Sequence, residues 1–311
     1  MVYNYGGSSG YGGSVTKLNS NGAGYFYTNG TNFNSPSNVA IDAAGNVWVL
    51  NSGNVNGGSV TALNSSGDLI GVFAPSGANF NYPSGEAIDA AGNVWVANSG
   101  GSNVIELNSS GGLVGAFAPS GANFNGPQRV AIDAAGNVWV TSGSGNSVTE
   151  LNSSGGLVGN FAPSGANFNY PYGVTIDAAG NAWVTNAAGS SVTELNSSGG
   201  LVGNFAVGDE PDAVAIDAAG NVWVANGVGN SVTELDSSGG LAGNFAPRGA
   251  NFNYPYAVAI DAAGNVWVTS GAAVPNGPQP SVAELVGAAR PVLTPLVACL
   301  KQSPPHAVCL P

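Results

Sequence analysis

The stretch Ile41–Val49 reads IDAAGNVWV, and it decides the fold because nearly the same nine residues recur along the chain. The other copies differ from it at no more than one residue and begin at Ile88, Ile132, Ile176, Ile216 and Ile260. All six Trp residues lie in these copies, at intervals of 40 to 47 residues. A period near 44 residues with four short apolar runs per unit is typical of β-propeller blades. The repeat therefore predicts an all-β propeller of four-stranded blades.

One unit, which begins at Pro171, shows how four strands fit into the period. We expect strands at residues 173–176, 182–185, 191–195 and 201–205, which we name a, b, c and d. The turns DAAGN and NSSGG join a to b and c to d, and each opens with Asp or Asn and contains Gly where a left-handed residue fits. The Trp of strand b is large enough to fill the gap between neighbouring blades.

The two ends of the chain determine the predicted number of blades. The chain begins inside a strand b, followed by strand c at residues 14–18 and strand d near residues 23–27, while residues 305–310 align with a strand a. We therefore predict one domain, 1–311, with seven blades, the last closed by residues 1–30 and a C-terminal strand. The alternative is six blades, with the N-terminal strand d closing the last one. The predicted units begin near residues 36, 83, 127, 171, 211, 255 and 305.

The composition disfavours several classes of partner. The net charge is −12, from 17 acidic and 5 basic residues, so there is no basic surface to bind nucleic acid or an anionic membrane. No run of 18 apolar residues is present, which argues against membrane insertion. No signal peptide is visible, although a surface rich in Asn, Ser and Gly favours an extracellular or cell-surface location. Cys299 and Cys309 could form a disulfide or remain free thiols. We expect the protein to be a monomer.

Two acidic residues recur with the repeat. The Asp that opens each DAAGN turn could bind calcium, but capping of its own turn is the stronger interpretation, because identical turns spread around a ring do not converge. These residues are Asp42, Asp89, Asp133, Asp177, Asp217 and Asp261. A Glu in strand c, as at Glu106 and Glu194, is expected to be a solvated charge near the rim, since Lys17 and Ala62 occupy the same place in other units. We therefore predict no metal site.

The segment Pro171–Val184, PYGVTIDAAGNAWV, resembles the NHL repeat, and the resemblance extends over nearly the whole chain. It implies the propeller fold. Two enzyme branches of the superfamily have similar repeats. The streptogramin lyases need a His base and a metal-binding acid, and the peptidyl-amide lyases need His-bound zinc. The only His of this chain is His306. The catalytic residues of those enzymes thus have no counterpart, and we expect no catalytic residues and no cofactor.

The differences between units indicate where a ligand could bind. The b–c loops and the residues just before strand a vary, and in a propeller both lie on the same face. The d–a connection adds recurrent aromatic residues, of which Phe is expected to pack under the loop and Tyr to be available for sugars or peptides. The candidate ligand-binding tyrosines are Tyr82, Tyr170, Tyr172, Tyr254 and Tyr256. The alternative is neutral drift of surface loops.

Two charged residues depart from the repeat on strand a. Glu86 stands where the other units have Val, and Arg129 stands in the next unit where others have Asn, Gly or Ala. A carboxylate on the innermost strand is costly unless it is paired or wet. We therefore expect Glu86 to line the axial channel, to face Arg129 and to belong with it to the ligand-binding site.

These observations favour a non-enzymatic NHL-like propeller that serves as a binding or scaffold module for a protein, peptide or carbohydrate partner. The alternatives are a lyase of the streptogramin-lyase type and a purely structural surface repeat.

Overall fold

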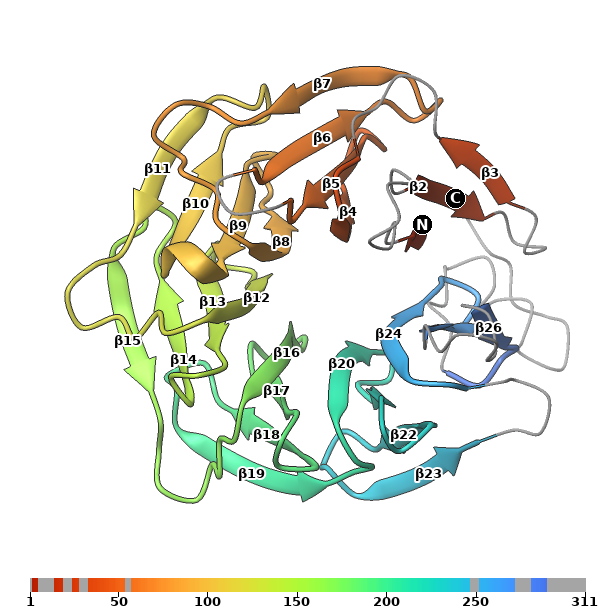
Figure 1. Cartoon of the computed structure of the whole chain (residues 1–311). Coiled ribbons are helices and arrows are strands. Elements are labelled where there is room, and N and C mark those ends of the chain that lie inside the picture. The colour runs from red at the N-terminus through yellow and green to blue at the C-terminus, as the bar shows by residue number, and fades with distance from the viewer. Residues whose placement is uncertain are drawn as a thin grey trace, which may run out of the picture.

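In a computed structural model, the chain folds into antiparallel sheets that are arranged around a central axis (Figure 1). It describes residues 2–4, 14–18, 24–27, 33–53, 57–246, 252–271 and 281–289. The sheets of the first half are β1 (Val2–Asn4), β2 (Ser14–Leu18), β3 (Gly24–Tyr27); β4 (Pro36–Ile41), β5 (Val47–Asn51), β6 (Ser59–Leu63), β7 (Leu69–Phe73); β8 (Pro83–Ile88), β9 (Val94–Asn98), β10 (Asn103–Leu107), β11 (Leu113–Phe117); and β12 (Pro127–Ile132), β13 (Val138–Ser142), β14 (Ser147–Leu151), β15 (Leu157–Phe161).

The second half continues the same order. Its sheets are β16 (Pro171–Ile176), β17 (Ala182–Asn186), β18 (Ser191–Leu195), β19 (Leu201–Ala206); β20 (Pro211–Ile216), β21 (Val222–Asn226), β22 (Ser231–Leu235), β23 (Leu241–Phe245); and β24 (Pro255–Ile260), β25 (Val266–Ser270), β26 (Ser281–Leu285). In the described residues the single helix is the short 3-10 turn η1 (Ser99–Gly101). The described part of the chain therefore has no helix that is long and apolar enough to cross a membrane.

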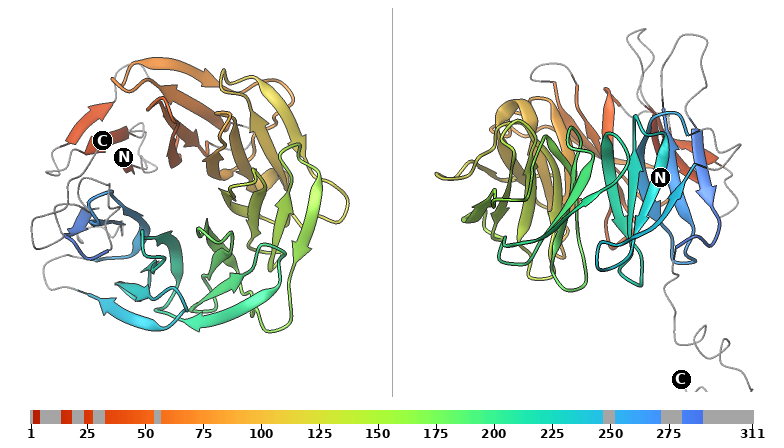
Figure 2. Two further views of the ribbon diagram at one scale, coloured as in Figure 1. Left: turned by 180° about the vertical axis from the view of Figure 1, so that it is seen from behind. Right: turned by 90° about the horizontal axis from the view of Figure 1, so that it is seen from below.

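Each blade is a meander whose strands follow one another from the axis to the rim (Figure 1). Strand a of each blade contacts strand a of the next, from β4 through β8, β12, β16 and β20 to β24. The edge-on view shows the blades side by side around the axis (Figure 2). The propeller prediction is therefore confirmed, and the four strands expected in the unit from Pro171 are those observed.

The N-terminal strands form the sheet on which the number of blades depends. Six blades have an innermost strand that begins with Pro, in agreement with the count of the six-blade alternative, and the last of them, β24–β25–β26, has three strands in the described part of the chain. The sheet β1–β2–β3 also has three described strands, and in it β3 pairs with β2, so the described β3 does not close the last blade as that alternative expected. Its strand β1 contacts β4, as expected for a strand b beside the first complete blade. Residues 305–310, the predicted closing strand, lie outside the described residues, as do Cys299 and Cys309.

The tryptophans pack between blades, as the sequence indicates. Trp183 is buried in a cluster with Val222, Val224 and Leu235 of the following blade. Its ring also stacks on Phe205, at the end of strand d of its own blade, with 5.6 Å between ring centroids. The pairs Trp48–Phe73, Trp95–Phe117, Trp139–Phe161 and Trp223–Phe245 repeat this arrangement. An aromatic pair thus contributes to the apolar core in each of these interfaces between blades.

The DAAGN turn is held by its Asp, and the indole of strand b takes part. One carboxylate oxygen of Asp177 accepts from the backbone N–H groups of Ala179 (2.9 Å) and Asn181 (2.8 Å). The other accepts from the side-chain amide of Asn181 (3.1 Å) and from the Trp183 indole (3.2 Å). The capping interpretation is thus confirmed, and the same carboxylate also positions the interface tryptophan.

The prediction of solvated glutamates in strand c is wrong. Glu106, Glu150 and Glu194 are buried, because each is paired across the sheet with the Trp of strand b and therefore lies on the side that the next blade covers. Glu194 accepts a hydrogen bond of 2.9 Å from Asn181. Burial, and then the neighbouring charge of Asp89, raises the pKa of Glu106 to about 7.

Candidate functional site

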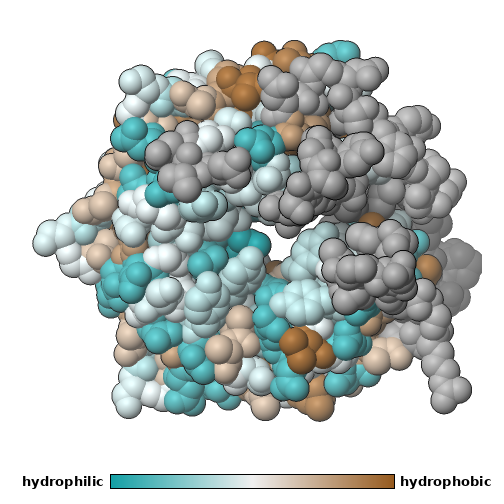
Figure 3. All heavy atoms as spheres, in the orientation of Figure 1, coloured by the Kyte–Doolittle hydropathy of each residue, from teal (hydrophilic) through white to brown (hydrophobic). Residues whose placement is uncertain are grey.

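A pocket with a volume of about 1310 Å³ opens at the axis of the ring. It lies on the face formed by the b–c loops and the d–a connections, and the space-filling view shows the corresponding hollow at the centre of the molecule (Figure 3). The DAAGN and NSSGG turns lie at the opposite ends of the strands. The pocket is therefore on the face that the sequence predicted for ligand binding.

About half of the residues in the pocket wall come from two positions per blade, which flank the Pro that begins strand a. Reading around the ring, these pairs are Ser35 and Ser37, Tyr82 and Ser84, Gly126 and Gln128, Tyr170 and Tyr172, Glu210 and Asp212, and Tyr254 and Tyr256. All of these residues except Ser35 and Gly126 line the pocket. The backbone is thus nearly constant while the side chains differ from blade to blade, and that difference gives the pocket its individual chemistry.

The residue before each Pro has a left-handed backbone conformation. The angle φ is 47° at Tyr82, 54° at Tyr170 and 55° at Tyr254, and Gly126 has φ of 66° in the equivalent place. Residues other than Gly seldom adopt this backbone conformation, because it costs them about 1–2 kcal/mol. In two blades a hydrogen bond to the b–c loop of the preceding blade supports it: the backbone N–H of Tyr170 donates to Asn146 (2.8 Å) and that of Tyr254 to Asn230 (2.9 Å).

The structure brings six of the seven predicted site residues to this pocket: Tyr82, Arg129, Tyr170, Tyr172, Tyr254 and Tyr256. Tyr82 and Tyr170 are exposed, whereas the other four are partly buried in the wall. The phenylalanines of the d–a connections pack beneath the loops, as predicted, and Phe80 and Phe124 are buried. Aromatic residues thus divide into a buried set that supports the loops and a set of tyrosines that reaches the pocket.

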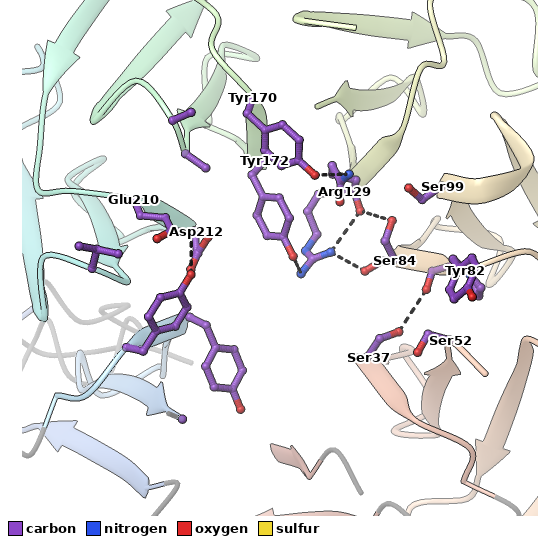
Figure 4. Close-up of a pocket in the computed structure, with 18 of the residues that line it drawn as sticks. Ser37, Ser52, Tyr82, Ser84, Ser99, Arg129, Tyr170, Tyr172, Glu210 and Asp212 are labelled. Atoms are coloured by element: carbon purple, nitrogen blue, oxygen red, sulfur yellow. Dashed lines mark hydrogen bonds between the residues drawn. The ribbon is translucent and has the colours of Figure 1, made fainter. Parts of the chain in front are cut away.

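Arg129 is held between two blades (Figure 4). Its guanidinium donates to the backbone carbonyls of Ser84 and Gln128 and, at 2.8 Å, to the hydroxyl of Tyr172. The same group lies over the Tyr172 ring, 4.4 Å from its centre. These contacts fix the ring of Tyr172 at the pocket wall and leave Arg129 largely engaged with protein.

Glu86 does not face Arg129 or line the pocket, so that part of the prediction is wrong. Only 6% of the residue is exposed, and neither carboxylate oxygen has a hydrogen bond of normal geometry. Burial raises the pKa of Glu86 well above its usual range, and the nearby backbone N–H of Leu50 offsets this only in part. The side chain stands where Val130 and Val214 pack against the preceding blade, which explains its burial.

The pocket has an acidic corner that was not predicted from the sequence. Glu210 and Asp212 flank Pro211 and lie together on the wall in Figure 4, apart from Arg129 and the serines of β4 and β8. The hydroxyl of Tyr254 donates to Glu210 at 2.6 Å. Burial, and then the charge of Glu210, raises the pKa of Asp212 to about 7, although Arg129 acts in the opposite direction. The signal in the sequence was the shared Pro, since tyrosines flank Pro171 and Pro255 in the same way.

Comparisons with known proteins identify the family. Residues 8–274 match the model of the virginiamycin B lyase family. A streptogramin B lyase structure is similar, with 15% identity over 82% of this chain and 83% of that chain and a TM-score of 0.72. So is a catalytically inactive histidine-to-alanine variant of virginiamycin B lyase from Staphylococcus aureus with quinupristin, at 17% identity over 82% and 84% and a TM-score of 0.71.

A chain in the structure of a nidogen/laminin complex also shares the fold, with 17% identity over 82% of this chain and 95% of that chain and a TM-score of 0.61. Comparison of the sequence with curated proteins gave no match. At these identities the structural likeness shows the fold alone, whereas the family model covers most of the chain. The chain therefore belongs to the virginiamycin B lyase family.

Proposed function

We propose that this propeller is a non-enzymatic binding module that holds part of a protein, peptide or carbohydrate partner in its axial pocket. The observation that carries the proposal is that the side chains flanking the Pro of strand a differ between blades and mostly line one pocket, while the turns at the other end of the blades repeat. Tyr, the commonest of these pocket residues, combines apolar area with a hydroxyl and is frequent in binding surfaces.

The family match favours lyase activity as the second candidate. In the Staphylococcus aureus virginiamycin B lyase, a histidine-to-alanine variant is catalytically inactive. The single His of this chain, His306, falls outside the matched segment 8–274. Because a His base has no counterpart within that segment, binding without catalysis is the better supported function.

Binding is tested on arrays of peptides and glycans, followed by titration of any ligand found. Tyr172→Ala should weaken binding by about 2 kcal/mol, which is about 30-fold, if this ring is a central contact. Ser198→Ala, in an exposed NSSGG turn, is the matched control and should leave the affinity unchanged. If turn-face substitutions weaken binding and Tyr172→Ala does not, the pocket is not the binding site.

The lyase alternative is tested by incubating the full chain with a streptogramin B antibiotic and Mg²⁺. We expect no ring opening. Turnover that persists through repurification and disappears in the Tyr172→Ala variant would overturn the non-enzymatic proposal.

A further inference from the structure

We propose that the axial pocket recognises a cationic amine, such as the lysine side chain of a peptide or protein partner, at the corner formed by Glu210, Asp212 and the tyrosines of the two adjoining blades. This inference rests on the proposed function, because it names the chemical class of ligand for the same pocket. Three features of the corner support it: the free hydrogen-bonding capacity of the carboxylates, the flanking rings and the charge of the wall.

The carboxylate of Asp212 lacks a donor. The residue is partly buried at the pocket wall, and among the described residues no N–H or O–H group donates to its side chain. Glu210 beside it accepts from the Tyr254 hydroxyl, so one of its oxygens is occupied. A partly buried carboxylate without a donor, next to a second negative charge, is stabilised most by a ligand that brings both N–H donors and a positive charge.

Tyrosines stand on both sides of this acidic corner. Tyr172 comes from the blade before Glu210 and Asp212, and Tyr254 and Tyr256 come from the blade after them. The contact of Arg129 with Tyr172 shows that a ring of this wall already accepts a cation, at 4.4 Å from its centre. A ligand ammonium group between the carboxylates and these rings would gain ion-pair and cation–π attraction together.

The charge of the wall selects against other ligands. Among the described residues, those of the wall that carry a charge are Asp209, Glu210, Asp212 and Arg129, so their formal sum is negative, and Arg129 is engaged by Tyr172 and by backbone carbonyls. An anionic ligand would therefore meet repulsion. A metal ion is also disfavoured, because the acids have different partners: Asp209 accepts from Ser190 and Glu210 from Tyr254. In the described part of the chain no three such side chains gather into a metal-binding group.

The ionisation of Asp212 should make the affinity of the corner for an amine depend on pH. Its pKa of about 7 means that a fraction of this carboxyl is neutral near pH 7, whereas a lysine amine keeps its charge up to about pH 10. Affinity for an amine should therefore increase as the pH rises from about 6 to about 8. A neutral ligand held by the rings alone would show no such increase.

The test is a titration of the full chain, labelled with 3-fluorotyrosine and followed by ¹⁹F NMR. The probes are Nα-acetyl-lysine amide and its uncharged analogue Nα-acetyl-norleucine amide. Tyr172→Phe and Tyr254→Phe variants assign the two resonances beside the acids. The lysine probe should shift both resonances, the norleucine probe should not, and the affinity for lysine should fall by at least about tenfold in the Glu210→Gln, Asp212→Asn double variant. Asp68→Asn removes a charge from a turn on the opposite face and is the matched control.

Each contrary outcome has a distinct meaning. Equal shifts with both probes would overturn the inference and leave the pocket a binding site for neutral groups. Shifts that survive the double variant would also overturn it. If neither probe shifts the resonances, the inference is overturned as well. The array experiment then decides the proposed function separately, because a ligand whose binding depends on Tyr172 would keep the pocket as its site.

Discussion

Two aspartates at opposite ends of neighbouring blades stand in opposite circumstances. Asp177, in a DAAGN turn, accepts four hydrogen bonds from its own turn and from Trp183. Asp212, at the pocket end, accepts none from the described residues and is flanked by Glu210. The turn carboxylate stabilises the blade, whereas the pocket carboxylate is costly to the fold. Such a difference is expected when one end of a repeat maintains structure and the other interacts with a partner.

The largest expected effect separates these two carboxylates directly. Asp177→Ala should lower the free energy of unfolding by about 3 kcal/mol, because several hydrogen bonds to a charged group are lost and water replaces them only in part. Asp212→Ala, the matched substitution at the other end, should cause no loss. Urea unfolding followed by tryptophan fluorescence measures both. An equal loss in the two variants would show that the blade ends do not differ in this way.

Glu86 lies outside both ends, in the apolar interface between blades, and the comparison predicts that it destabilises the fold. Glu86→Val should raise the free energy of unfolding by about 2 kcal/mol at neutral pH, because an unpaired buried carboxylate is replaced by the residue of the other blades.

The sign of the pH dependence follows from the raised pKa of Glu86 in the fold. The folded protein retains the proton to a higher pH than the unfolded chain does, so the wild type loses stability as the pH rises above the usual Glu range. The advantage of Glu86→Val should therefore widen from about pH 4.5 upward. Val130→Glu is the reverse control and should destabilise. A loss of stability in Glu86→Val would mean that the carboxylate has a favourable partner.

A smaller effect tests the left-handed residue before each Pro. Tyr82→Gly should be more stable than Tyr82→Ala by about 1 kcal/mol, because Gly adopts this conformation without strain and both variants remove the same ring. Gly126 shows that the propeller accepts Gly at this position of a blade. Thermal unfolding of the two variants gives the difference, and a more stable Ala variant would contradict the strained conformation.

The smallest effect is a difference in pH dependence between two Asp→Asn variants. In Asp212 the raised pKa means that the wild type loses stability relative to Asp212→Asn as the pH rises from about 4 to about 7. Asp42 behaves oppositely: burial alone would raise its pKa, but hydrogen bonds from Trp48, Asn46 and the turn lower it. Stability relative to Asp42→Asn should therefore decrease as the pH falls below about 4. Parallel pH profiles of the two variants would contradict this distinction.

The fold was readable from the sequence because the repeat displays its own alternation of strands and turns. The unit from Pro171 gave four strands at the observed places, since the turns DAAGN and NSSGG recur without gaps. The pocket tyrosines were readable for a related reason. They occupy positions that vary between otherwise similar units, and such variation is visible without any structure.

What could not be read depends on how blades stack. Glu106 and Glu86 are each buried by a neighbouring blade, and a single strand pattern does not show which side that blade covers. The Val residues that replace Glu86 elsewhere were nevertheless a signal for an apolar interface. Glu210 and Asp212 were overlooked because their unit has AVGDEP in place of APSGANFNYP, which removes the aromatic residues that marked the other units.

The proline at the start of each strand a also bears on how such a molecule can be redesigned. It fixes the backbone between two side chains, and six prolines do this at equivalent places around the axis: Pro36, Pro83, Pro127, Pro171, Pro211 and Pro255. Residues as different as Ser, Tyr, Gln and Asp already occupy the place after it. A combinatorial library that randomises only these flanking codons would vary one concave surface while every turn and interface tryptophan stays as encoded. The propeller can thus be used as an antibody-like scaffold whose diversity is confined to a ring of paired codons.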